Sequence, residues 1–528
     1  MRVLLVNWAR LPDGPLDGGG VNGYCQQLAL ELVGRGHEVA YLSSGVTYTR
    51  RGNGTGPCEV RRLDDFRGVR VFDVVNSPVI APGPCQARRP EAEIASPELE
   101  RELARFVGLL APDVVHFQNI EGLSAASVDA MRRAVGAGCV VFSLHNYHTV
   151  CPQVYLMQRG RVPCRNFRGG QACVGCADVC DPAEERLIRA GVRERHAPAP
   201  APEPAKPRRA WGVFIPPPEP VAQPLPGRPT AVLADVDAAI APAPHLAPAA
   251  EPPLPGEREP LDNTPTPDPW DPGTENVYGA RRRAMVGALA SCDAVLGVSP
   301  FVRAKFEALG VPGGVLRTMP IGTRMGDLAR AAGLHAGGEV RPRRPGPVRL
   351  AFLGYHNFYK GLHCLVDALE RCDAGVLGEI DLLVSAKAVE PIEPALRRLR
   401  ARLARLSVEH GYRYDEIPDL LRDREVGVVP SVWWDNGPQT VLEFQACGLA
   451  VVGAAVGGVP DMVRDGVDAL LFRGNDAGAL AAALARLGRE PGLVDRLRGG
   501  VRPPKGMGEH AAELERLYAE LLRARRRG

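Results

Sequence analysis

The stretch that decides the fold runs from residue 426 to residue 471 and reads VGVVPSVWWDNGPQTVLEFQACGLAVVGAAVGGVPDMVRDGVDALL. An apolar strand at 426–430 leads through a loop to a helix that Gly437 and Pro438 begin, with Pro at the first helical position, where its missing N–H costs nothing. A second apolar strand at 450–455 leads into a glycine turn and another helix. Two successive strand–turn–helix units predict a parallel sheet that binds a ligand at the carboxyl ends of its strands.

Two acids flank the start of the first of these helices, Asp435 before it and Glu443 within it. The N–H groups of a helix start favour an anion such as phosphate, so Asn436 and Gly437 are candidate binding residues. Because a carboxylate repels phosphate, the natural partners of the two acids are sugar or ribose hydroxyls. The alternative interpretation is a pair of solvated acids at a helix start.

The segment resembles the donor-binding core of family 4 glycosyltransferases, which transfer a sugar from a nucleotide sugar with retention at the anomeric carbon. The family pattern is a Glu, seven residues and a second Glu; here the spacing is kept and the first acid is Asp435. The resemblance implies that Asp435 orients the donor sugar, that Glu443 holds the ribose, and that the chemistry needs no cofactor besides the nucleotide-sugar co-substrate. It also implies the GT-B fold, an α/β architecture of two Rossmann-like domains facing across a cleft.

The second domain is predicted to begin with the strand 348–355, VRLAFLGY, which contains Gly354. Lys360-Gly361 then precedes a helix, as in the family, where the Lys contacts the donor diphosphate. The resemblance therefore implies that Lys360 binds the donor and acts in catalysis, with Gly354 beside it. The Arg that usually follows the strand's glycine is replaced by Tyr355, so the diphosphate contacts depend on Lys360 and helix N–H groups.

The first domain is predicted to open with a βαβ unit that has a glycine-rich first turn. A strand at 2–7, the run Gly18-Gly19-Gly20 and a helix over about 22–34 form this pattern. Gly19 and Gly20 would let the backbone approach a ligand closely. A flexible surface turn has the same composition.

Two further buried strands, 113–118 and 139–145, carry His116 and His145 at or near their ends. Parallel strands end at one edge of a sheet, so both histidines should lie near the glycine turn. The matching family strands also end in His and line the acceptor side. We therefore expect His145 to be catalytic and His116 to bind donor or acceptor, with a capped structural histidine as the alternative.

Five cysteines occur within residues 151–180, and two of them form a CxxC pair. Four thiolates in a tetrahedron suit structural zinc, and a CxxC knuckle supplies two ligands from one turn. A subset of family 4 enzymes has a similar Cys-rich loop. Iron–sulfur ligation, a redox pair and free thiols are the alternatives. The expected zinc ligands are Cys151, Cys164, Cys173 and Cys176, with Cys180 as the alternate.

A proline-rich segment interrupts the first domain, because residues 197–275 contain 23 of the 50 prolines. Such a composition predicts a disordered surface insertion, interpreted either as a partner-binding arm or as a tolerated loop. The predicted organisation is an acceptor domain at 1–196, the insertion at 197–275, the rest of the first domain and a linker at 276–345, a nucleotide-sugar-binding domain at 346–505, and a helix with a basic tail at 506–528.

The bulk composition limits partners and location. A net charge of +3 over 528 residues indicates no nucleic-acid partner. The N-terminus lacks the apolar run of a signal peptide, and no uncharged apolar stretch of about 18 residues predicts a transmembrane helix. An odd count of 13 cysteines without a secretion signal favours the cytoplasm. The arginine-rich end could touch anionic lipid at the inner face of a membrane.

The sequence thus predicts a retaining glycosyltransferase that moves a sugar from a nucleotide sugar to a glycan, lipid-linked or small-molecule acceptor, a reaction typical of polysaccharide biosynthesis. One alternative is a non-catalytic scaffold that uses the proline-rich arm to bind a partner. Another is a glycosidic phosphorylase on the same fold, which would need a lysine in a setting suited to pyridoxal phosphate.

Overall fold

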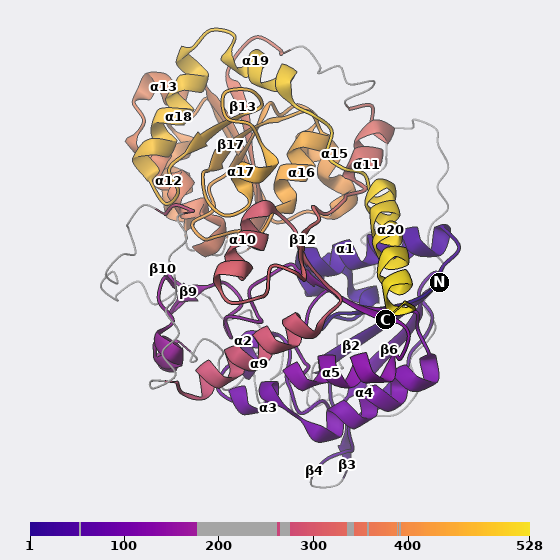
Figure 1. The fold of residues 1–528 in the computed structure, drawn as a ribbon. Helices are drawn as coiled ribbons and strands as arrows, with labels where there is room; N and C mark the ends of the chain where they lie inside the picture. Colours follow the sequence, from indigo (N-terminus) through magenta and orange to yellow (C-terminus); the bar gives the residue numbers. More distant parts are fainter. Residues whose placement is uncertain are drawn as a thin grey trace, which may run out of the picture.

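The computed structural model describes residues 1–51, 54–176, 261–263, 275–334, 343–355, 358–387, 389 and 392–527. Cys180 lies outside the described residues, as does the predicted insertion at 197–275 apart from residues 261–263 and 275. Two α/β units make up the described chain, one above the other in Figure 1.

The first unit is built on an eight-stranded sheet that is parallel except for its edge strand β5. The strand order is β12-β11-β8-β7-β1-β2-β6-β5, so the order reverses beside β1, where open α/β sheets bind ligands. The strands are β1 (Arg2–Val6), β2 (Glu38–Thr47), β5 (Glu59–Arg62), β6 (Arg70–Val75), β7 (Val114–Phe117), β8 (Cys139–Leu144), β11 (Ala294–Gly297) and β12 (Leu316–Thr318).

Helices cover both faces of this sheet because alternate residues of each strand point to opposite sides. Val3 and Leu5 of β1 pack in a core with α1 and the C-terminal helix α20 (Met507–Arg525), whereas Leu4 and Val6 pack in a core with α4, α5 and α9. The helices of this unit are α1 (Gly14–Gly34), α2 (Gly83–Gln86), α3 (Pro90–Ile94), α4 (Pro97–Leu110), α5 (Ala125–Ala134), α6 (Gln171–Val174), α9 (Val277–Ser291) and α10 (Pro300–Ala308), and the short hairpins are β3 (Arg50–Arg51) with β4 (Gly54–Thr55) and β9 (Met157–Gln158) with β10 (Val162–Pro163).

The second unit is built on a six-stranded parallel sheet in the order β15-β14-β13-β16-β17-β18. Its strands are β13 (Val348–Tyr355), β14 (Ile380–Lys387), β15 (Arg405–Glu409), β16 (Val426–Val429), β17 (Ala450–Ala454) and β18 (Ala469–Phe472). Its helices are α11 (Met325–Ala331), α12 (Leu362–Arg371), α13 (Ala374–Gly378), α14 (Glu393–Arg400), α15 (Ile417–Leu421), α16 (Gln439–Ala446), α17 (Val459–Met462), α18 (Ala477–Arg489) and α19 (Leu493–Gly500).

The helix expected to begin with Pro at its first position begins one residue later. Pro438 has an extended ψ of 121° and is the N-cap, and α16 starts at Gln439. The strand before it packs tightly on this helix, because a Cβ at Gly427 would overlap the ring of Phe444. Glycine in the strand therefore lets α16 lie directly on the sheet, which fixes where the loop between them runs.

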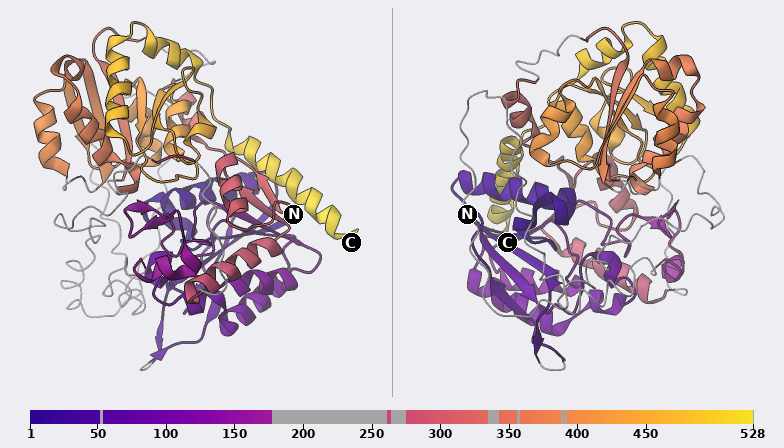
Figure 2. Two further views of the ribbon diagram at one scale, coloured as in Figure 1. Left: turned by 60° about the vertical axis from the view of Figure 1, so that its left-hand side comes forward. Right: turned by 180° about the vertical axis from the view of Figure 1, so that it is seen from behind.

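The C-terminal helix α20 (Met507–Arg525) returns to the first unit and runs beside α1 (Figures 1 and 2). Tyr518 is fully buried there, and His510 bonds the hydroxyl of Tyr24 at 2.7 Å. Arg525, in the last turn, forms a 3.0 Å ion pair with Asp293. The helix thus ties the end of the second unit to the core of the first.

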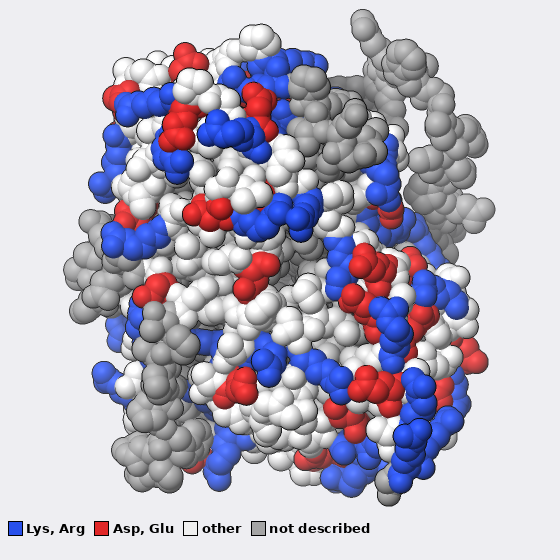
Figure 3. Space-filling model, turned by 45° about the horizontal axis from the view of Figure 1, so that its top comes forward, with Lys and Arg blue, Asp and Glu red and all other residues white. Residues whose placement is uncertain are grey.

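Within the described parts of the chain, no helix combines the length and apolarity that crossing a membrane requires. Acidic and basic side chains are mixed over the face drawn in Figure 3, as the net charge of +3 leads one to expect.

Candidate active site

Lys360 and Asp435 meet at the carboxyl ends of two neighbouring central strands, β13 and β16. The sheet continues from β13 to β14 and β15 on one side and from β16 to β17 and β18 on the other. The two side chains therefore lie at the point where the strand order reverses, the switch point of the sheet. Lys360 ends the short 3-10 turn after β13, and its Nζ lies 2.9 Å from Oδ2 of Asp435. The lysine is therefore held in place by a charge-assisted hydrogen bond.

The position after Lys360, occupied by Gly361, requires a glycine, both for its backbone conformation and for lack of space. Its φ is +73°, and a Cβ there would overlap the carbonyl oxygen of Pro430. A side chain would push the start of α12 away from the end of β16 and with it Lys360 away from Asp435. Gly354, at the end of β13, also has a positive φ, +152°.

Glu443 lies one turn into α16 and is buried. Burial raises the pKa of its carboxyl to about 7, and the positive charge of Lys360 opposes that shift. Within the described structure, Oε2 of Glu443 has no hydrogen-bond partner. Because buried polar atoms are normally paired, this oxygen is suited to accept a hydrogen bond from a ligand hydroxyl. Lys360, Asp435 and Glu443 thus come together as the sequence predicts.

Asn436 connects the two units directly. Its side-chain Nδ2 donates to the main-chain carbonyl of Leu144 at the end of β8 (3.3 Å). Its main-chain carbonyl accepts a hydrogen bond from Ser299 Oγ (2.9 Å). At Gly437, the next residue, a Cβ would make ordinary van der Waals contact with Met462 of the second unit (3.8 Å) and Val298 of the first (3.9 Å). The loop after β16 therefore lies at the junction between the two units.

The glycine run of the first unit lies inside α1, which begins at Gly14, and not, as predicted, in a turn before a helix that begins near residue 22. It reaches the same junction. Gly19 breaks α1 with a φ of +66°, and the carbonyl of Gly20 accepts a 2.9 Å hydrogen bond from Gln439 at the start of α16. A Cβ at Gly20 would lie 3.2 Å from that amide nitrogen, tighter than ordinary contact. The glycine run thus approaches the helix that carries Glu443.

His145 lies directly after β8, next to the residue that contacts Asn436. Its Nε2 bonds Oε1 of Gln118 at 2.9 Å, and its ring lies 4.8 Å from that of Tyr24. Burial lowers the pKa of His145 to about 4, so the ring is neutral at neutral pH. It can exchange hydrogen bonds with a bound sugar but carries no positive charge.

His116 does not join this group. It is fully buried, with Nδ1 2.6 Å from the hydroxyl of Tyr518 in α20 and Nε2 2.8 Å from Ser143 Oγ. Burial holds its pKa well below the usual value. With both ring nitrogens bonded inside the protein, His116 connects α20 to the first sheet.

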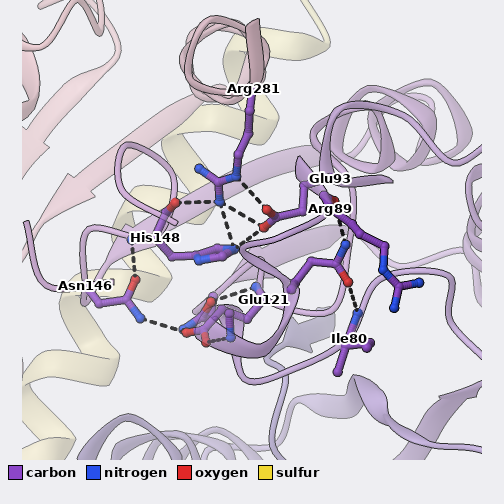
Figure 4. Close-up of polar contacts among 10 residues, drawn as sticks. Ile80, Arg89, Glu93, Glu121, Asn146, His148 and Arg281 are labelled. Carbon is purple, nitrogen blue, oxygen red and sulfur yellow. Dashed lines mark hydrogen bonds and ion pairs between the residues drawn. The ribbon is translucent and has the colours of Figure 1, made fainter. Parts of the chain in front are cut away.

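The sequence interpretation missed a buried polar cluster in the first unit (Figure 4). Arg281 of α9 binds both carboxylate oxygens of Glu93 in α3, at 2.7 and 2.9 Å, and also the carbonyl of His148, at 2.8 Å. His148 Nε2 lies 2.9 Å from Glu93. The Arg281 charge helps to lower the pKa of Glu93 to about 2 against the opposing effect of burial.

Glu121 forms a second buried contact beside this cluster (Figure 4). Its Oε1 accepts hydrogen bonds from Asn119 (2.8 Å) and Asn146 (3.0 Å), and its Oε2 accepts from the N–H of Gly83 (2.5 Å). These bonds join the loops that follow β6, β7 and β8. They fix the wall of the first unit that carries His145.

The four expected zinc ligands gather in one region. The pKa of Cys173 is raised, chiefly by burial and also by interaction with the thiols of Cys151, Cys164 and Cys176. Cys176 Sγ accepts a hydrogen bond from the N–H of Arg159 at 2.8 Å. Among the described residues, no three His, Cys, Asp or Glu side chains are arranged as a metal site. Thiols are a ligand type that binds zinc. Because the described cysteines do not form the ligand geometry of a metal site, the zinc site stays a prediction.

Two family models match the chain, and together they span more than half of it. The model described as "Glycosyl transferase 4-like domain" matches residues 19–180, and that described as "Glycosyl transferases group 1" matches residues 347–490. Each falls within one of the two α/β units.

Curated relatives match over short segments. A D-inositol 3-phosphate glycosyltransferase of Streptomyces bingchenggensis is 37% identical over 139 residues, 25% of this chain and 30% of the relative. Another, of Actinosynnema mirum, is 53% identical over 58 residues, 11% of this chain and 14% of the relative. The chain thus matches less than a third of the length of these relatives.

Solved structures share the whole architecture at low identity. Sucrose-phosphate synthase of Thermosynechococcus elongatus has a TM-score of 0.58 at 14% identity, covering 99% of this chain and 100% of that one. Anabaena HepE in complex with UDP has a TM-score of 0.53 at 12% identity, covering 98% and 100%. The predicted fold of two α/β domains is confirmed. The shared architecture shows that the fold is GT-B, and the two matched family models show that the chain belongs to the glycosyltransferases.

Proposed function

We propose that the protein transfers a sugar from a nucleotide sugar to an acceptor hydroxyl with retention at the anomeric carbon. The observation that carries the proposal is the group of Lys360, Asp435 and Glu443 at the switch point of the second sheet. One oxygen of the buried Glu443 has no hydrogen-bond partner among the residues that the structure describes. A cation beside two acids suits a diphosphate flanked by two hydroxyl-bearing sugars, because the cation attracts phosphate and the acids accept from hydroxyls.

Each of the three residues has a separate role in the proposed reaction. Glu443 accepts hydrogen bonds from the ribose, Asp435 orients the donor sugar, and Lys360 stabilises the charge that develops on the departing diphosphate. The bond from the anomeric carbon to the diphosphate breaks while the acceptor oxygen bonds to the same face. The acceptor proton passes to the diphosphate, so no protein nucleophile is required.

UDP-linked sugars are the first donors to test, since the structural neighbour HepE was solved with UDP. The curated relatives are named for inositol 3-phosphate, which makes a phosphorylated polyol the first acceptor to test, followed by glycans and lipid-linked sugars. Neutral His145, on the wall of the first domain, would contact the acceptor or the donor sugar.

Melting curves with UDP, GDP and ADP separate this proposal from a non-catalytic scaffold. A ligand that binds only the folded protein raises the melting temperature. We expect one diphosphate to raise it at millimolar concentration and the other two to raise it less. A protein indifferent to all three would contradict the proposal and favour the scaffold.

The pH dependence of nucleotide binding should report the ionisation of Glu443. Its pKa is about 7 in the folded protein and its ordinary value is 4.5, so the folded state binds this proton more tightly and loses stability as pH rises between the two values. Ribose hydroxyls bind the ionised form better. We therefore expect the affinity for the preferred diphosphate to rise with pH toward a plateau above about 7, approaching tenfold per unit below it.

Calorimetry at several pH values measures this dependence, and Glu443→Gln is the control because an amide does not ionise. The variant should bind with little change over the same range. An equal rise in parent and variant would assign the pH dependence to another group.

We also propose that Cys151, Cys164, Cys173 and Cys176 hold one structural zinc, since binding at a site of four thiolates would stabilise the glycine-rich loop. Elemental analysis should find about one zinc per chain. Cys173→Ser should lower the zinc content and speed trypsin cleavage in the loop, while Cys364→Ser, a buried cysteine of α12, should change neither. Metal-free protein with a protease-resistant loop would contradict the proposal.

A further inference from the structure

Three consecutive residues, Leu261-Asp262-Asn263, contact the second domain although they belong to the proline-rich insertion of the first. The side-chain amide of Asn263 pairs with both backbone groups of Gly457, donating to its carbonyl at 2.9 Å and accepting from its N–H at 2.7 Å. Leu261 is buried, and its N–H donates to the carbonyl of Gly474 at 3.0 Å. Between them, the carbonyl of Asp262 accepts from Trp434 Nε1 at 2.8 Å.

These contacts cross the ends of three adjacent strands. Trp434 follows β16, Gly457 follows β17 and Gly474 follows β18, and the three strands are neighbours in the sheet. The tripeptide therefore lies over the carboxyl edge of the second sheet, the edge at which Lys360 and Asp435 meet. We call residues 261–263 the edge segment.

Gly457 transmits this contact to the candidate active site. Its φ is +60°, and a Cβ there would overlap the backbone N and carbonyl oxygen of Asp435. The N–H of the next residue, Gly458, donates to the Asp435 carbonyl at 2.7 Å. The Gly457-Gly458 turn thus packs against the backbone of Asp435, while Asn263 bonds both backbone groups of Gly457.

We propose that Asn263 is a positioning residue for glycosyl transfer and acts through the Gly457 turn on Asp435. Without its amide, both polar groups of Gly457 lose the hydrogen bonds that it makes with them, and the turn gains freedom to move. Asp435 would then move relative to Lys360. Because small displacements of catalytic groups slow reactions strongly, turnover should fall while ground-state binding persists. The inference rests on the proposed transfer activity.

Steady-state kinetics of Asn263→Ala, with the preferred nucleotide sugar, tests the proposal. We expect kcat to fall about tenfold, with the Kd for the free diphosphate changed less than about twofold, because the Asn263 amide bonds the backbone of Gly457, beside Asp435. Asn263→Asp keeps an acceptor for the Gly457 N–H but loses the donor, so its kcat should lie between those of the parent and the Ala variant. Asp262→Ala is the matched control, because its side chain is 62% exposed and lies 3.9 Å from Arg165, whereas its hydrogen bond with Trp434 is made by the main-chain carbonyl, which the substitution keeps.

Hydrogen–deuterium exchange of peptides that contain Gly457 and Gly458 gives a readout that needs no activity. The amides of this turn should exchange faster in Asn263→Ala than in the parent and the Asp262→Ala control. Unchanged exchange together with unchanged kcat would overturn the proposal, as would equal loss of diphosphate binding and turnover, which indicates general unfolding. If the parent protein itself transferred no sugar, the proposed transfer would be contradicted instead. The exchange measurement alone would then test whether Asn263 stabilises the Gly457 turn.

Discussion

Replacement of Lys360 by Met should lower kcat by about 10²–10³-fold, the cost typical of removing one group that stabilises transition-state charge. The ammonium group lies 2.9 Å from Asp435 at the switch point of the second sheet. In the proposed reaction, the departing diphosphate gathers negative charge there. Because that charge is larger in the transition state than in the bound donor, kcat should fall more than KM rises. Initial rates over a range of donor concentrations measure both constants.

Lys505→Met is the matched control for this prediction. Lys505 bonds the carbonyl of Pro320 at 2.9 Å and Glu513 of α20, so it has structural partners in another part of the chain. The control should keep the parent kcat. A Lys360 variant with parental kcat and KM would show that the Lys-Gly match to the family is accidental.

Glu443→Ala should weaken binding of the preferred diphosphate by about 10–100-fold. The carboxylate would make charge-assisted hydrogen bonds to ribose hydroxyls, each worth about 1.5–3 kcal/mol. Calorimetry measures the loss directly. The deoxyribonucleotide gives the sharper comparison, because the variant should discriminate less than the parent between ribose and deoxyribose.

Glu425→Gln provides a control for the removal of a buried acid elsewhere in the same domain. Glu425 pairs with Arg349 at 2.7 Å at the opposite, amino end of the strands. Its loss should lower stability without changing the affinity of properly folded protein. Unchanged affinity in Glu443→Ala would remove Glu443 from the nucleotide site.

The second domain was predicted well because its determinants are local. Strand, loop, acid, helix and glycine follow one another between residues 426 and 471, and each agrees with the parallel sheet that the structure has. The Lys360–Asp435 contact joins residues 75 positions apart, yet it follows from the rule that parallel strands end at one edge. Family spacing then selected Lys360, Asp435 and Glu443 as the candidate side chains there.

The remaining features depend on partners that lie far away in the sequence. His116 lies near the end of a buried strand, as predicted, but Tyr518 lies 402 positions away and no local signal shows that α20 packs against it. Arg281 and Glu93, 188 positions apart, meet for the same reason. Asn263 lies in a proline-rich stretch whose composition predicts no contact at all, although the Asn side chain can pair with a backbone as a neighbouring strand would.

Proton NMR of the product formed from a nucleotide sugar tests the central claim most directly. The protein would be incubated with UDP-, GDP- and ADP-linked hexoses and a panel of acceptors that includes a phosphorylated polyol. We predict that one donor releases its diphosphate and gives a glycoside whose anomeric proton has the donor's configuration. An inverted configuration would contradict retention, and the absence of transfer or hydrolysis with every donor would contradict the proposed glycosyl transfer.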